Sequence, residues 1–147
     1  IARYPINPYY HELKGEILFN FGKKDALTYY RKALQILPYD NLLKMGNAII
    51  ELNIYSDKAE LSNSLKLLRE IIFHEPKNAA AYYYIGVYYQ KIAKPKKSYL
   101  YMAKFYMLHR MFDKAKFFAN NVIKISKHTS SEYLQARDIL LRIEHIK

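Results

Sequence analysis

The chain has 147 residues, no cysteine and a formal net charge of +11. This is the length of one ordinary domain, and the lack of cysteine excludes disulfides, thiol catalysis and zinc sites built on cysteine. Four glycines and five prolines are too few for an all-β chain with many tight turns. The chain opens without an initiator methionine or a signal-peptide pattern, so we expect a domain of a longer protein.

Apolar residues recur at helical spacing (i, i+3, i+4, i+7) along almost the whole sequence, with a short polar turn every 15 residues or so. Strand-like alternation of apolar and polar residues is absent. The pattern therefore predicts an all-α chain of about eight antiparallel helices.

Within these helices, one arrangement of small and aromatic residues repeats. Small residues let two helices approach closely, aromatic residues fill the gaps between them, and proline ends a helix. Two segments fit the second helix of a tetratricopeptide repeat and two fit the first: Ala26-x3-Tyr30-x2-Ala33-x4-Pro38, Ser64-x3-Leu68-x2-Ile71-x4-Pro76, Tyr82-x2-Ile85-Gly86-x2-Tyr89 and Tyr99-x2-Met102-Ala103-x2-Tyr106. Residues 8–128 therefore resemble the tetratricopeptide family, which implies a right-handed solenoid of helical hairpins and a role in protein interaction.

The resemblance divides the single domain, residues 1–147, into repeats at about 8–40, 41–78 and 79–95, the last fused to 96–128. A lengthened loop is expected from Asn53 to about Ser62. Helix 98–110 is expected to act as a second helix although its sequence is that of a first helix. A capping helix over 130–146 is expected to start with a Thr129-x-x-Glu132 capping box.

The positive charge is concentrated between Lys91 and Lys127, where ten Lys or Arg residues face one acid, Asp113. An anionic partner would explain this excess. Mutational drift in an AT-rich genome would explain it equally, since Ile, Asn, Tyr and Phe are also abundant. Lysine dominates over arginine and no nucleic-acid-binding module is recognisable, so nucleic acid is the less favoured partner.

The sequence holds no catalytic constellation. His11-Glu12 begins like the zinc motif H-E-x-x-H, but Gly15 stands where the second histidine ligand is required. The other histidines are too far apart to share a site. We therefore expect this chain to be no enzyme and to hold no cofactor or metal.

A binding role is the alternative, because first-helix residues line the concave face in tetratricopeptide proteins. Tyr82 and Tyr89 are expected in the core. The positions expected to face a groove for an extended or helical polypeptide, with the lysines attracting acidic segments, are Asn47, Tyr83, Val87, Lys91, Lys97 and Lys104.

Two stretches go beyond the generic repeat. Residues 8–33 are similar to the start of the repeat tail of BepA-like bacterial zinc metallopeptidases, and Ala136–Leu140 is similar to its end. The resemblance implies a periplasmic protein, a zinc-binding peptidase domain upstream, and contact with that domain, with substrates or with assembly machinery. The alternative is a free-standing cytoplasmic scaffold or adaptor.

Overall fold

A computed structural model describes residues 8–20 and 25–146, although the side chains of residues 10, 11 and 17–20 lie outside this description and with them the prediction for His11. In the described residues there are eight helices and no strand, which confirms the all-α class. The chain divides into two compact units, residues 1–71 and 72–147. Each is described by itself.

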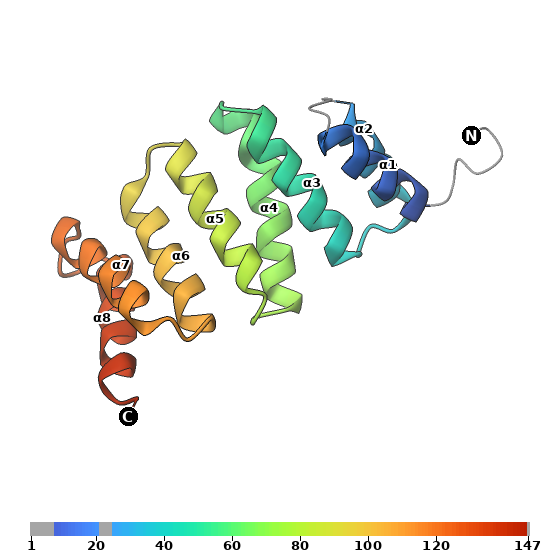
Figure 1. Cartoon of the computed structure of the whole chain (residues 1–147). Helices are drawn as coiled ribbons and strands as arrows, with labels where there is room; N and C mark the ends of the chain where they lie inside the picture. The colour runs from blue at the N-terminus through green and yellow to red at the C-terminus, as the bar shows by residue number, and fades with distance from the viewer. Residues whose placement is uncertain (1–7, 21–24, 147) are drawn as a thin grey trace. The chain divides into compact units, whose positions relative to one another are not determined.

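Unit 1 is built on α1 (Pro8–Asn20), α2 (Ala26–Ile36), α3 (Asn41–Ile54) and the first part of α4 (Lys58–His74). Helix α2 contacts α1 and α3, and α1 also contacts α3 (Figure 1). The small residues predicted at the closest approach, Ala26 and Ala33, are fully buried. The core around them consists of Leu27, Tyr30, Leu43 and Ile50.

Both predicted helix ends near proline are present. Helix α2 ends two residues before Pro38, and α4 ends two residues before Pro76, where proline cannot continue the hydrogen-bond ladder. Asp40 then starts α3, since its side chain accepts a hydrogen bond from the Leu43 amide at 3.0 Å.

The predicted long loop from Asn53 to Ser62 is wrong, because α4 already begins at Lys58. Two polar side chains of α4, Asn63 and Ser64, share a buried partner on α3. Glu51 of α3 is fully buried and accepts hydrogen bonds from Asn47, from Asn63 at 2.7 Å and from Ser64 at 2.9 Å. These bonds satisfy the carboxylate and fix α4 against α3.

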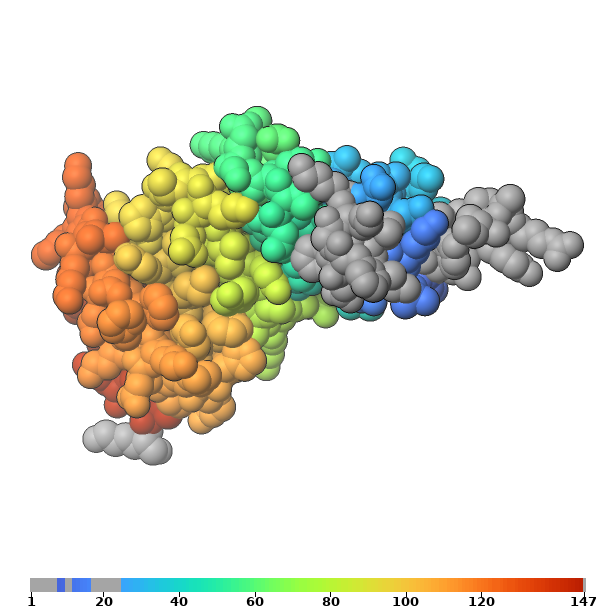
Figure 2. Space-filling view, turned by 45° about the horizontal axis from the view of Figure 1, so that its top comes forward, coloured from blue at the N-terminus to red at the C-terminus, as the bar shows by residue number. Residues whose placement is uncertain are grey.

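Unit 2 contains α5 (Ala79–Lys91), α6 (Pro95–Leu108), α7 (Phe112–Ile125) and α8 (Ser131–Glu144). The surfaces of α5, α6 and α7 follow one another in yellow, amber and orange in Figure 2. The close approach predicted at Gly86 is present, since Ser98 of α6 donates a hydrogen bond to the Gly86 carbonyl at 2.8 Å.

Helix α6 contacts α8 as well as its chain neighbours α5 and α7. This contact, two helices along the chain, is also the relation of α1 to α3 in unit 1. Helix α6 is thus related to α8 as α1 is to α3.

Helix α8 is present as predicted, and Tyr133, Ala136 and Ile139 are buried on its inner stripe. The predicted cap is shifted by one residue. Ser130, not Thr129, is the N-cap, and its hydroxyl accepts from the Tyr133 amide at 3.2 Å. The Thr129–Glu132 capping box is therefore not the structure that forms.

Candidate functional site

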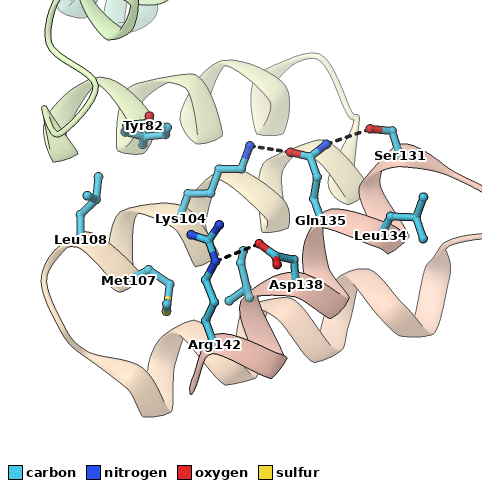
Figure 3. Close-up of a pocket in the computed structure, with 10 residues that line it drawn as sticks. Tyr82, Lys104, Met107, Leu108, Ser131, Leu134, Gln135, Asp138 and Arg142 are labelled. Atoms are coloured by element: carbon cyan, nitrogen blue, oxygen red, sulfur yellow. Dashed lines mark hydrogen bonds and ion pairs between the residues drawn. The ribbon is translucent and has the colours of Figure 1, made fainter. Parts of the chain in front are cut away.

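A cleft of about 560 Å³ lies between α6 and α8 in unit 2, and we call it the α6–α8 groove (Figure 3). Residues of α5, α6 and α8 form its walls. Its lining residues are Tyr82, Lys104, Met107, Leu108, Ser131, Leu134, Gln135, Asp138, Ile139 and Arg142.

Lys104 is the half-buried cation of this groove. Its ammonium donates to the Gln135 side-chain oxygen at 2.7 Å and lies 4.8 Å from the centre of the Tyr101 ring. Burial lowers the pKa of Lys104 below its usual value, because the ammonium loses hydration. An ammonium group that is partly dehydrated and bonded to a neutral acceptor forms a stronger, charge-assisted hydrogen bond with an anionic acceptor.

The walls beside Lys104 are apolar and open. Leu134 is 59% exposed and Leu108 is 38% exposed. On the α8 side Arg142 pairs with Asp138 at 3.0 Å, so this pair adds no net charge. Across the groove, the Tyr82 hydroxyl donates to the Pro76 carbonyl at 2.9 Å, which holds the ring in place, and burial raises the pKa of Tyr82.

A second cleft of about 380 Å³, the tyrosine cleft, lies among α5, α6 and α7. None of its residues lines the α6–α8 groove. Tyr106 stacks on Phe118 with ring centroids 5.6 Å apart, so one wall is already paired within the protein. Its lining residues are Tyr83, Gln90, Ala93, Pro95, Ser98, Tyr99, Met102, Tyr106 and Phe118.

The predicted groove residues therefore divide between different surfaces. Tyr83 is in the tyrosine cleft and contacts the Phe105 ring at 5.3 Å. Val87 and Lys91 are partly exposed on the same helix, α5. Lys104 is in the α6–α8 groove. Lys97 is exposed, and its ammonium lies over the Tyr89 ring, 5.4 Å from the ring centre.

Asn47 is not on an open surface. It is 1% exposed and its amide donates to Glu51, so its side chain belongs to the buried polar contacts between α3 and α4. The expected groove contact at Asn47 is corrected on this ground. Of the two tyrosines expected in the core, Tyr89 is 5% exposed, whereas Tyr82 lines the groove.

Unit 1 has a cleft of about 420 Å³ between α1 and α3, lined by Glu12 and Glu16 above an apolar floor that includes Met45 and Ile49. The pKa of Glu12 is raised, first because the carboxyl is partly buried and then because Glu16 and Asp40 repel its charge. Sequence reasoning did not predict this cleft.

Sequence reasoning also missed the contribution of α8 to the groove. Leu134, Gln135 and Asp138 were assigned to a capping helix that only shields the core, although Leu134 is an exposed leucine beside polar residues. That exposed apolar position was the signal available in the sequence pattern.

The described part of the chain contains no group of three or more His, Cys, Asp or Glu side chains that could hold a metal ion. His109 packs edge-on against Phe105, and His128 stacks on Tyr133. Among the described helices, none is long and apolar enough to cross a membrane.

Comparisons with known proteins give no match: no family model, no curated protein and no solved structure is similar to this chain.

Proposed function

We propose that this chain is a non-catalytic protein-interaction module that binds a polypeptide segment in the α6–α8 groove. The observation that carries the proposal is the combination in one cleft of open apolar side chains, Leu108 and Leu134, with the half-buried ammonium of Lys104. Covering Leu108 and Leu134 removes apolar surface from water, which favours binding.

The bound segment presents an apolar side chain to Leu134 and a carboxylate to Lys104. A carboxylate replaces the neutral Gln135 oxygen as the acceptor and forms a charge-assisted hydrogen bond. This pairing restores the interactions that Lys104 loses on burial. The partner is therefore a polypeptide with neighbouring apolar and acidic residues.

The test is selection of peptides from a random phage-displayed library on the whole chain, followed by affinity measurement of the selected peptides. We expect Leu134→Ser and Lys104→Met each to weaken binding about tenfold, the effect of losing one central contact. Phe117→Ser is the matched control, since Phe117 is 60% exposed and lies outside the groove. Equal affinities for all four proteins would overturn the proposal.

We also propose that the helices form a tetratricopeptide-like repeat array and that the parent protein is a BepA-like periplasmic zinc metallopeptidase. The two-helix spacing of the α1–α3 and α6–α8 contacts supports the repeat array, and the sequence resemblance supports the parent. The genomic reading frame upstream of Ile1 tests the second part. An H-E-x-x-H helix and a signal peptide are expected there; a start codon directly before Ile1 favours the free-standing adaptor.

A further inference from the structure

A third cleft of unit 2, about 420 Å³, is lined by three lysines, and we call it the lysine cleft. Lys94, Lys96 and Lys97 come from the turn before α6 and its first residues. Ile125 at the end of α7 and Glu132 at the start of α8 complete it, together with Pro95. The chain's basic stretch thus meets an exposed apolar residue here, since Ile125 is 47% exposed.

The lysine cleft and the α6–α8 groove both reach the first turn of α8, since Ser131 lines the groove and its chain neighbour Glu132 lines the lysine cleft. Hydrogen bonds connect Lys104 to this turn of α8: Lys104 donates to Gln135, and Gln135 donates to Ser131 at 2.9 Å (Figure 3).

The distance between the lysine cleft and Lys104 follows from the geometry of α6. Lys97 and Lys104 both lie over tyrosine rings, those of Tyr89 and Tyr101, and are seven residues apart on α6. Seven residues of helix span about 10 Å. An extended chain covers that distance with about three residues.

The charges in the lysine cleft are not neutralised. Three ammonium groups face one carboxylate, Glu132, and none of the three lysines forms an ion pair among the described residues. Lys94 and Lys97 are exposed. Such a site attracts an anionic group without having to break an existing pair.

Among anionic partners the geometry favours a polypeptide. The three cations are lysines, with no arginine fork to read bases and no aromatic side chain in the cleft on which a base could stack. Ile125 and Glu132 give the concave site an apolar and an acidic side chain, whereas a membrane presents a flat surface.

We propose that the segment bound in the α6–α8 groove carries a cluster of acidic residues about three residues from the carboxylate that pairs with Lys104, and that this cluster occupies the lysine cleft. The proposal rests on the proposed function of the groove. It assigns the basic stretch of the chain a direct role in choosing the partner.

The experiment uses a groove-binding peptide selected on the whole chain, lengthened with Asp-Asp-Asp or, as control, Asn-Asn-Asn, at successive distances from the carboxylate that pairs with Lys104. We expect the aspartate peptide to bind about tenfold more tightly, with an optimum near the three-residue spacing. This advantage is expected to shrink at high salt because exposed charges are screened.

Three variants locate the effect. Lys94→Glu combined with Lys97→Glu is expected to remove the aspartate advantage and to leave the asparagine peptide unchanged. Lys114→Glu combined with Lys116→Glu, in the same basic stretch but at the start of α7, is the matched control and keeps the advantage. Glu132→Gln is expected to strengthen aspartate binding severalfold, since it removes the opposing charge.

The outcomes separate the two proposals. Equal affinity of the aspartate and asparagine peptides would overturn the acidic-cluster inference and leave the groove proposal standing. If neither peptide responds to Leu134→Ser, the groove proposal itself fails. Binding of the chain to phosphatidylserine vesicles that is lost with Lys94→Glu and Lys97→Glu, without a change in peptide affinity, would assign the cleft to a lipid surface instead.

Discussion

The ring of Tyr30 occupies the space into which a side chain at Gly46 would project. Tyr30 is 4% exposed on α2 and lines the inner end of the α1–α3 cleft, so its ring is packed between these helices. The same ring lies against Gly15 of α1, where an added Cβ would come within 2.6 Å of it. One aromatic side chain thus sets the approach of both α1 and α3.

Gly46→Ala is therefore expected to destabilise the protein by about 1–3 kcal/mol through overpacking, despite the better helix propensity of alanine. Gly86→Ala is the matched control. A Cβ there meets the terminal methyl of Met102, the flexible end of a side chain, at 2.8 Å, so the methionine can adjust. Urea unfolding followed by circular dichroism measures both; equal free energies of unfolding for the two variants would contradict the Tyr30 argument.

Glu51 offers a second stability test. Its buried carboxylate accepts from Asn47, Asn63 and Ser64, so Glu51→Ala leaves three donors without an acceptor. We expect a loss of about 1–3 kcal/mol for each of the two buried donors, Asn47 and Ser64, that is left without this acceptor. Glu60→Ala is the control, since Glu60 is exposed near the start of α4. A loss below 1 kcal/mol, on the scale of a surface change, would show that water replaces the missing acceptor.

The hydrogen bonds to Glu51 show which part of the packing sequence reasoning could not supply. The repeat spacing placed Ser64 in a helix, but the start of that helix was expected after about Ser62. In the structure α4 begins at Lys58. Glu51, twelve and thirteen residues earlier in the chain, accepts hydrogen bonds from Asn63 and Ser64. No local sequence pattern contains this pairing between two helices.

The helices themselves were predictable because their apolar spacing and prolines are local features. The candidate site was less so. Lys104 was predicted as a groove residue and lines the α6–α8 groove, but the groove exists only because α8 packs beside α6. Tyr83 and Lys104, expected on one surface, line two separate clefts, the tyrosine cleft and the α6–α8 groove.

Replacing alanine by glycine is expected to have opposite effects on stability at two positions, Ala93 and Ala103. Ala93 has a φ of 57°, in the left-handed region, at the end of α5, where the Lys94 amide bonds back to the Tyr89 carbonyl at 2.8 Å. Glycine adopts this conformation without strain, so Ala93→Gly is expected to stabilise the protein by up to about 1 kcal/mol.

Ala103→Gly is the paired control, because Ala103 is buried in the middle of α6. There the same substitution is expected to cost about 1 kcal/mol or more. Thermal melts of the two variants should move in opposite directions. A lower melting temperature for both would mean that the turn after α5 is not strained in solution.

Glu12 predicts a pH-dependent effect in unit 1. Its pKa is raised in the folded protein by partial burial, and further by Glu16 and Asp40. The folded state therefore holds this proton more tightly than the unfolded chain, whose glutamate pKa is about 4.3. This contribution to stability is complete below the unfolded pKa and is lost as the pH rises through the folded pKa. At neutral pH the Glu12 carboxylate is thus an unfavourable charge in the α1–α3 cleft.

Glu12→Gln is therefore expected to raise the melting temperature at neutral pH. The increase is expected to shrink as the pH falls toward the pKa of glutamate in the unfolded chain. Glu144→Gln, at an exposed position at the end of α8, should change little at either pH. If Glu12→Gln lowers the melting temperature at neutral pH, the carboxylate makes a favourable contact that outweighs its repulsion by Glu16 and Asp40.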